Sequence, residues 1–304
     1  MTKSLVTVII PARHELYLQE TVSDLFHKAG GEIEVIVILD GYWPAPILKD
    51  NPNSILIHRE RRGMRAAINS AVAIAKGEYL MKVDAHCMFD EGFDEKLKAD
   101  CDVDWLVVPR RYSLDVDNWC IKPDREAIDY EYLGWPWQNG KEVHGSKVGL
   151  HAQKWKARAS ERGEILLDEN MSFQGSCWFM TKAHFLERIG GLNENGYGTF
   201  IGEPQEIGLK TWLGGGSVYT NKKTWYAHLW KGQVYRERFQ ARHGFGYTRI
   251  GFHEAKDGNA YSVDYWMSNR WEARKHDIEW LIERFWPVPS WPEDRTQWIP
   301  LPTS

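Results

Sequence analysis

Apolar runs of strand length alternate with segments of helical periodicity over about the first 90 residues of this chain. The runs are rich in β-branched residues and show little polar alternation, which is typical of strands buried on both faces of a sheet. The expected strands span 5–10, 33–39, 55–58 and 79–83, and the expected helices span 15–29 and 63–75. Because parallel strands need crossover connections, this order predicts an α/β fold with a mainly parallel sheet.

The second half of the chain shows a weaker version of the same pattern. Strands are expected at 105–109, 175–180, 217–220 and 224–228, and helices at 95–100, 181–189 and 203–213. Periodicity fades between 111 and 170, which favours long loops that cover a site. Beyond Lys231-Gly232 the sequence becomes rich in Arg and Trp. We therefore expect a main domain over 1–232 and a C-terminal extension over 233–304 that packs on it or contacts a substrate.

Polar residues follow three of the expected strands at their carboxyl ends. Pro11-Ala12-Arg13 follows the first strand, Asp40-Gly41 follows the second, and Asp84-Ala85-His86 follows the strand at 79–83. Ligands bind at this edge of open α/β sheets, so the three strand ends predict a nucleotide-sized crevice. Asp84 and His86 fall on one face and can hold a divalent metal. The alternative for this pair is a helix-capping Asp beside a packed histidine.

Composition limits the class of protein. The formal net charge is −4, which excludes a globally basic nucleic-acid binder. The four cysteines show no CxxC spacing and are typical of buried thiols in a reducing compartment. Neither a signal peptide nor an apolar stretch of about 20 residues is visible, so the sequence predicts a soluble cytoplasmic protein. The 16 tryptophans indicate stacking surfaces or a core stapled by aromatic rings.

Several motifs recur in the order seen in one known group of enzymes. They are the strand ended by Pro11, the Asp40-Gly41 turn, the helical segment 61–66 with its arginines, Asp84-Ala85-His86-Cys87, Ile201–Glu206 with Trp212, and Tyr226-Ala227-His228. Together they resemble the GT-A fold glycosyltransferases of family 2, and most closely the polypeptide N-acetylgalactosaminyltransferases. The resemblance covers about residues 4–232, and its strength lies in the order of the motifs.

This resemblance implies a Rossmann-like GT-A sheet and a sugar transfer from a nucleotide sugar, linked to UDP in the manner of the family. It implies Asp84, His86 and His228 as metal ligands. Mixed imidazole and carboxylate ligands suit Mn²⁺, with Mg²⁺ as the alternative. A divalent cation of this kind stabilises the charge that grows on the departing diphosphate.

The resemblance also implies roles for residues around the metal. Pro11, Arg13 and Asp40 are expected to contact the nucleotide together with Asp84, and Arg65 is expected to reach the diphosphate or the base. Glu203 and Glu206 are the candidate catalytic carboxylates. Simpler alternatives remain open, since Asp40 can serve an Asp-Gly turn without a ligand and Glu203 is favoured at a helix start by the dipole alone.

Two departures from the family pattern matter. The Asn that follows the family's Glu is Pro204 here, which also cannot act as the Asp base of inverting relatives. This departure favours retention of configuration and leaves inversion open. The family's lectin domain is absent from the sequence, so acceptor specificity does not carry over, and the hydroxyl acceptor can belong to a glycan, a protein or modified DNA.

Other functions compete with this interpretation. Basic and aromatic residues interleave at 235–243 and 266–291, which can hold DNA with a hydroxymethyl-pyrimidine base flipped out, or can form amphipathic helices packed on the main domain. A nucleotidyltransferase that makes sugar nucleotides shares such a sheet, but it normally has a Gly-rich loop after the first strand, where this chain has 11–15. A non-catalytic carbohydrate- or nucleic-acid-binding module is the third alternative.

Overall fold

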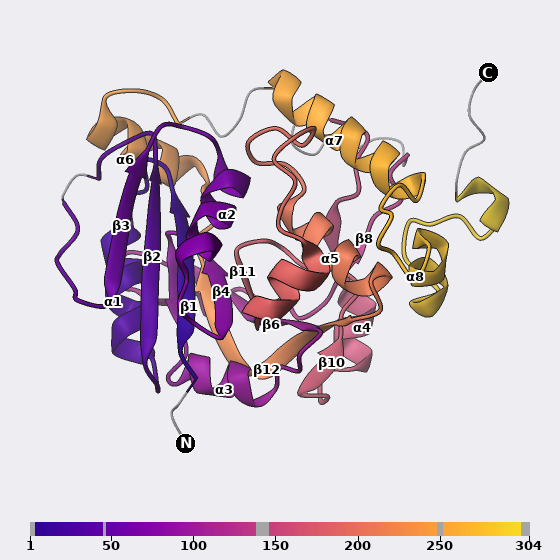
Figure 1. Cartoon of the computed structure of the whole chain (residues 1–304), viewed down its shortest axis with the longest axis horizontal. Coiled ribbons are helices and arrows are strands. Elements are labelled where there is room, and N and C mark those ends of the chain that lie inside the picture. Colours follow the sequence, from indigo (N-terminus) through magenta and orange to yellow (C-terminus); the bar gives the residue numbers. More distant parts are fainter. Residues whose placement is uncertain (1–3, 45–46, 138–145, 248–251, 299–304) are drawn as a thin grey trace.

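A mixed sheet lies at the centre of the computed structural model, in which residues 4–44, 47–137, 146–247 and 252–298 are described (Figure 1). The predicted ranges 1–232 and 233–304 both include a few residues outside this part of the chain. In spatial order the strands are β10-β12-β6-β11-β4-β1-β2-β3, with β5 paired to β12 and β7 paired to β6. A separate small sheet joins β8 and β9.

The strands have the following bounds: β1 Val6–Ala12, β2 Ile33–Asp40, β3 Ser54–Arg59, β4 Tyr79–Val83, β5 Cys87–Phe89, β6 Trp105–Asp115, β7 Cys120–Ile121, β8 Glu131–Leu133, β9 Ala152–Lys154, β10 Leu167–Glu169, β11 Cys177–Thr181 and β12 Ser217–His228. The α-helices are α1 Leu18–Lys28, α2 Met64–Ile74, α3 Phe93–Ala99, α4 Lys156–Glu161, α5 Glu203–Leu213, α6 Gln233–His243, α7 Phe252–Met267 and α8 Ile278–Arg284. A π-helix spans His184–Ile189, and a short 3₁₀ helix spans Arg295–Gln297.

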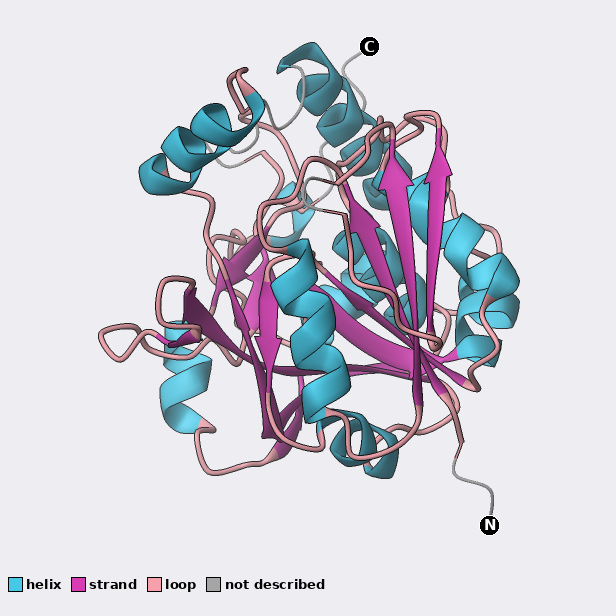
Figure 2. Ribbon diagram, turned by 90° about the vertical axis from the view of Figure 1, so that its left-hand side faces the viewer, coloured by secondary structure: helices cyan, strands magenta, loops and turns pink. Residues whose placement is uncertain are grey.

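Apolar residues on both faces of the sheet explain its burial. Successive residues of β1 point to opposite faces, so Val8 and Ile10 join one apolar core while Ile9 joins the other. α1 covers the first of these faces and α2 covers the second. Helices therefore flank both sides of the strands (Figure 2). The parallel pairing of β4, β1, β2 and β3 confirms the predicted mainly parallel sheet.

Two strands of the structure, β12 and β6, are longer than the sequence predicts. The expected strands at 217–220 and 224–228 are one strand, β12, whose register against β6 shifts between Asn221 and Trp225. The expected strand at 105–109 continues through Pro109 to Asp115. Pro109 pairs with Asn221, directly at the irregularity, where a missing backbone N–H is tolerated. Sequence periodicity does not reveal a strand that passes through a bulge.

The described part of 233–304 packs on the rest of the chain. Trp266, Ile278 and Leu281 belong to the same apolar core as α2 and α5. Tyr235 and Phe239 of α6 pack with Leu16 and Leu229. The division at residue 232 into two units stays a prediction. No helix in the ranges that the structure describes is long and apolar enough to cross a membrane.

A glycine positions the loop that enters α2. Gly63 has φ 92° and ψ 172°, a conformation that only glycine adopts readily. Its N–H donates to Asp40 Oδ2 at 2.9 Å. A Cβ at this position would lie 2.6 Å from the Thr199 Cβ and 2.7 Å from the Thr199 carbonyl oxygen. The Gly63 loop therefore tolerates no side chain.

We expect Gly63→Ala to lower the free energy of unfolding by about 2–5 kcal/mol, because backbone strain and a clash add together. Gly92→Ala is the matched control, since Gly92 also has a positive φ of 66° but no atom lies within 4 Å of the point that a Cβ would occupy. This control should lose only about 1 kcal/mol. Urea denaturation of both variants measures the difference, and equal losses would contradict the role of the Thr199 contact.

Candidate functional site

A cleft of about 900 Å³ opens at the carboxyl ends of the parallel strands. Its volume is in the range of small-molecule sites. Residues from widely separated segments line it, including Pro11–Glu15, Asp40, Lys82, Asp84–His86, Gly175, Glu203–Gln205 and His228–Gly232. The crevice predicted from the strand ends is therefore present, and it contains most of the residues proposed for it.

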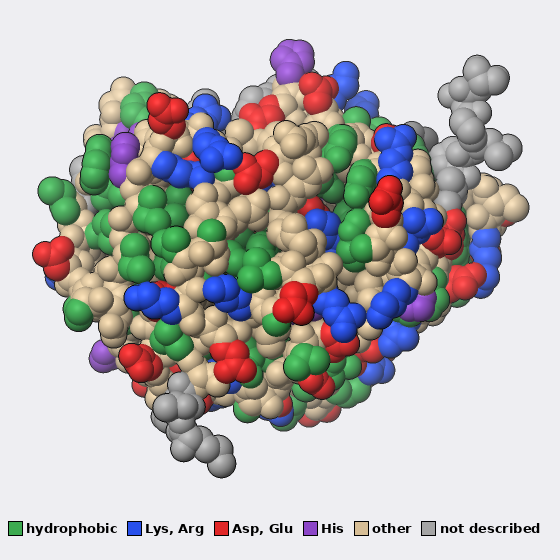
Figure 3. Space-filling view, in the orientation of Figure 1, with side chains coloured by type: hydrophobic (Ala, Val, Ile, Leu, Met, Phe, Trp, Pro, Cys, Tyr) green, Lys and Arg blue, Asp and Glu red, His purple; other side chains and the backbone are tan. Residues whose placement is uncertain are grey.

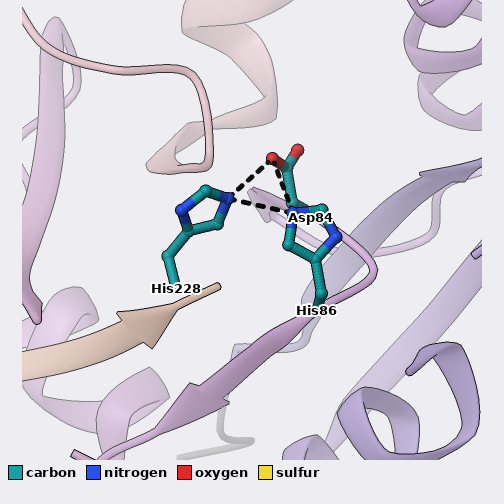
Figure 4. A group of neighbouring side chains, drawn as sticks. All are labelled: Asp84, His86 and His228. Atoms are coloured by element: carbon teal, nitrogen blue, oxygen red, sulfur yellow. Dashed lines mark hydrogen bonds and ion pairs between the residues drawn. The ribbon is translucent and has the colours of Figure 1, made fainter. Parts of the chain in front are cut away.

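Three side chains converge inside this cleft (Figure 4). His86 Nε2 lies 3.0 Å from His228 Nε2, and His228 Nε2 lies 3.2 Å from Asp84 Oδ2. The third distance, from His86 Nε2 to Asp84 Oδ2, is 3.7 Å. One carboxylate oxygen and two imidazole nitrogens thus face a common point, which is the donor set that a first-row divalent metal prefers.

Strand pairing brings these ligand atoms together. Asp84 follows β4 directly, and its N–H donates to the Ser176 carbonyl at 2.9 Å. β5 begins at Cys87 and pairs with β12, so that His228 lies opposite Cys87. The Leu229 N–H then donates to the His86 carbonyl at 3.2 Å. The backbone, and not side-chain packing alone, therefore holds the two histidines side by side.

The protonation states suit metal binding. Burial lowers the pKa of His228 to about 3, so the imidazole is neutral at ordinary pH, as a ligand must be. Burial works against ionisation of Asp84, but Lys82 and the two histidines hold the pKa of Asp84 well below its usual range. The site therefore presents a carboxylate together with a neutral His228.

Glu15 contacts the ring nitrogen of His86 that is not part of the ligand cluster, and Lys231 contacts Glu15 in turn. His86 Nδ1 lies 3.2 Å from Glu15 Oε2, and Lys231 Nζ donates to Glu15 Oε1 at 2.7 Å. Burial opposes the charge on Glu15, yet Lys231 and His86 lower the pKa of Glu15 to about 2. An ionised Glu15 accepts the Nδ1 proton of His86 and directs its Nε2 lone pair toward the ligand cluster. The sequence did not reveal this pair, although Glu15 follows the polar end of the first strand.

Lys82 is a second residue whose role the sequence did not reveal. Its Nζ donates to Asp84 Oδ1 at 2.7 Å and to the Gly175 carbonyl, and its side chain is 1% exposed. Burial alone would lower its pKa, but the charges of Asp84 and Glu203 raise the pKa of Lys82. The sequence feature that could have indicated this role is the presence of a lysine within the apolar run 79–83. Lys82 fixes one oxygen of Asp84 and leaves the other for the cluster.

Glu203 lies at the first turn of α5 and reaches the same part of the cleft. Its Oε1 accepts a hydrogen bond from Trp178 Nε1 at 2.5 Å, and its buried Oε2 has no hydrogen-bond partner among the described residues. A Cβ on Gly175 would lie 2.1 Å from Oε2, so glycine provides the space there. Burial raises the pKa of Glu203, and Lys82 partly offsets this effect. This buried oxygen therefore has unused capacity to accept a hydrogen bond.

The proposed nucleotide contacts come from the ends of β1 and β2. Pro11, Arg13 and Asp40 all line it. Asp40 Oδ1 accepts the Arg62 N–H at 2.8 Å and its Oδ2 accepts the Gly63 N–H, so this carboxylate holds the loop before α2. Burial and the nearby Arg61 lower the pKa of Arg13. Contacts of these residues with a nucleotide stay a prediction, and the structure adds the loop-holding role for Asp40.

Arg65 and Glu206 do not line the cleft. They form a buried ion pair, each side chain being 1% exposed. Arg65 also donates to the carbonyls of Ile201 and Asn193, and its guanidinium lies 3.8 Å from the centre of the Tyr197 ring. The structure thus gives both residues a place in the core, and the expected contact of Arg65 with the diphosphate or base and the expected catalytic role of Glu206 stay predictions. The apolar residues that surround Arg65 on α2 carry it into the core together with its partner.

We expect Arg65→Met to lower the free energy of unfolding by about 3–5 kcal/mol, because it leaves the Glu206 carboxylate buried without its main cation. Arg62→Met is the matched control. Arg62 pairs with Glu194 at the surface, where its side chain is 60% exposed, so its loss should cost less than about 1 kcal/mol. Chemical denaturation distinguishes the two variants, and a stable Arg65→Met protein with impaired nucleotide binding would instead support the predicted contact of Arg65 with the ligand.

Comparison with known proteins adds to this geometry. A putative polypeptide N-acetylgalactosaminyltransferase 13 from Drosophila melanogaster is 24% identical over 195 residues, which are 64% of this chain and 31% of that protein. The chain thus spans less than a third of the length of this curated relative.

Solved structures show a similar arrangement. The crystal structure of GalNAc-T7 with UDP, GalNAc and Mn²⁺ matches with a TM-score of 0.62 and 16% identity, over 88% of this chain and 49% of that chain. S. aureus TarS gives a weaker match, with a TM-score of 0.45 and 15% identity over 80% of this chain and 40% of that chain. The likeness to GalNAc-T7 confirms the predicted GT-A fold.

The family model described as glycosyl transferase family 2 matches residues 7–190, a range that runs from β1 through the first metal-ligand candidates to the π-helix. This match covers more than half of the chain. The protein therefore belongs to glycosyl transferase family 2.

Proposed function

We propose that this protein is a metal-dependent glycosyltransferase that moves a sugar from a UDP-type donor to a hydroxyl acceptor. The convergence of Asp84 Oδ2, His86 Nε2 and His228 Nε2 in the cleft of a family 2 fold carries this proposal. The similar structure of GalNAc-T7, which contains UDP, GalNAc and Mn²⁺, supports the choice of donor and metal. A sugar-nucleotide nucleotidyltransferase and a non-catalytic module fit the family less well.

The residues present fit a metal such as Mn²⁺. Two imidazoles and one carboxylate leave coordination positions for donor oxygens, and Glu15 orients His86 from behind. When bound, the cation supplies Lewis-acid stabilisation of the charge that develops on the diphosphate leaving group. The hydrogen bond from Lys82 holds Asp84 in one orientation. The carboxylate therefore does not have to reorient as negative charge develops on the leaving group.

In this proposal Glu203 and Lys82 line the part of the cleft that holds the transferred sugar. The free Oε2 of Glu203 accepts a hydrogen bond from a sugar hydroxyl, while Trp178 fixes the other oxygen. Pro204, which cannot act as a base, follows Glu203 at the start of α5. With no adjacent Asp to deprotonate an acceptor from the opposite side, we favour retention of configuration.

The C-terminal segments give less support to a DNA acceptor. On α6, Arg238 bonds to Tyr17 and Asp117, and Arg242 donates to the Leu16 carbonyl. Arg270 and Arg274 pair with nearby aspartates in the same way. Basic and acidic side chains are also interspersed over the face shown in Figure 3. These segments therefore match the packed amphipathic helices that the sequence left open as the alternative.

We expect UDP and Mn²⁺ together to raise the melting temperature more than either does alone. At about 100 times the Kd the added stability is about 2.7 kcal/mol. His228→Ala should abolish the metal-dependent part, because a ligand is lost. His27→Ala, an exposed histidine of α1, is the control and should respond like the wild type. Thermal-shift assays measure all three proteins, and a wild type indifferent to UDP with Mn²⁺ would refute the proposal.

Glu203→Gln tests the proposed contact between Glu203 and the transferred sugar. We expect release of UDP from the nucleotide-sugar donor to slow by about 100-fold, because the carboxyl group beside the reacting sugar becomes a neutral amide. Affinity for UDP with Mn²⁺ should stay unchanged. Glu187→Gln, at an exposed position of the π-helix, serves as the control. A coupled assay for UDP release measures the rate, and wild-type turnover by Glu203→Gln would exclude this role.

A further inference from the structure

Arg111, on β6, is a buried guanidinium with unused donors. Its side chain is 4% exposed, and its Nη2 donates to Glu131 Oε1 at 2.9 Å. Its Nε and Nη1 are buried without a hydrogen-bond partner among the described residues. Leaving the N–H groups of a charged side chain without acceptors is costly, so this arrangement indicates that something else accepts from them.

Arg111 borders the cleft beside the metal-ligand candidates. Its guanidinium carbon lies 5.5 Å from the centre of the Trp230 ring, and Trp230 lines the cleft with half of its surface exposed. The Trp230 ring in turn lies 5.8 Å from the His228 ring. Arg111 is therefore a neighbour of the cluster, on the side of β12.

A second cation lies close to Arg111. Lys154, on β9, lines the same cleft and is opposite Glu131 in the β8–β9 pairing. Burial and the charge of Arg111 lower the pKa of Lys154, which places the two positive groups within electrostatic reach of each other. Glu131 is the carboxylate that pairs with Arg111 here. Arg111 and Lys154 both lie near the single carboxylate of Glu131, so these three side chains together carry a net positive charge.

This positive region is separate from the expected nucleotide end. Pro11, Arg13 and Asp40 belong to β1 and β2 or follow them, whereas Arg111 belongs to β6. β4 and β11 lie between β1 and β6 in the sheet. A nucleotide over β1 and β2, with its diphosphate at the metal-ligand candidates, would leave Arg111 and Lys154 on the far side of those candidates.

We infer that Arg111 and Lys154 form an anion-binding subsite for the acceptor. The acceptor then carries a phosphate or a carboxylate next to the hydroxyl that receives the sugar. Guanidinium groups bind both oxyanions through charge-assisted hydrogen bonds, and the partly open Trp230 ring provides an apolar surface beside them. The identity of the bound anion as the acceptor rests on the proposed function, but the subsite itself does not depend on it.

An internal role for Arg111 makes a different prediction. A cavity of about 10 Å³, bordered by Arg111, Asp129 and Phe173, has room for one water molecule. If the free N–H groups serve only to bond such a water, neither Arg111 nor Lys154 affects the binding of anions.

The test uses the full chain saturated with Mn²⁺ and UDP, and a parallel sample without them. Glucose 6-phosphate, glucuronate and glucose are titrated into each sample, and binding is measured by calorimetry. We expect one or both anions to bind about tenfold more tightly than glucose, and Lys154→Met to remove about this factor without changing the affinity for glucose. Lys156→Met, at an exposed lysine two residues further, is the matched control and should behave as the wild type.

The arms of the experiment separate the explanations. A preference for glucose 6-phosphate identifies phosphate as the acceptor group, and a preference for glucuronate identifies carboxylate. Arg111→Lys, which keeps a cation in the buried position, should retain part of the preference. Equal affinity for all three probes, or anion binding that Lys154→Met leaves unchanged, would overturn the inference. If Lys154→Met lowered the affinity for UDP by as much as the affinity for the anions, the inference would also be overturned, because the cations would then bind the donor.

The same titrations keep this inference apart from the proposed function. Failure of UDP and Mn²⁺ to bind the wild type would contradict the transferase proposal alone. A Lys154-dependent preference for anions in the sample without UDP would still establish the subsite.

Discussion

The pairing of the carboxyl end of β12 with both β6 and β5 is the constraint on which the site depends. β12 runs parallel to β6 and, at its end, pairs antiparallel with the short β5. This second pairing places His228 beside His86, although 142 positions separate them in the chain. Since backbone hydrogen bonds of the sheet set the distance between the imidazoles, the ligand set is organised before any ligand arrives.

Paired buried charges complete that organisation. Lys231 and Glu15 lie behind His86, and Lys82 lies beneath Asp84. A buried charge is costly unless a partner of opposite sign is held in good geometry. The Lys82–Asp84 pair connects β4 to the loop that follows it, and the Lys231–Glu15 pair connects the loops after β12 and β1. The same contacts that satisfy buried charges therefore fix the directions of the groups expected to bind metal and donor.

The two halves of the cleft differ in how the chain builds them. The half near β1 and β2 comes from the regular βα pattern, whose strand ends meet at one edge. The other half comes from the small β8–β9 sheet, the end of β6 and the segment after β12. Irregular segments of this kind vary more easily without disturbing a core. The proposed nucleotide contacts lie in the first half, and the proposed anion-binding subsite lies in the second.

Sequence alone determined the mainly parallel sheet and the order of its main strands and helices, because apolar periodicity is a local signal. Strand-end polarity pointed to Asp84 and His86, and the family resemblance pointed to His228, as candidate metal ligands. The sequence could not place Arg65 or Glu206, since an arginine on a helix looks the same whether it faces a ligand or a buried carboxylate. It also missed Glu15, Lys82 and Arg111. Their roles depend on partners 71, 93 and 20 positions away in sequence, and only tertiary packing decides which charges share a buried volume.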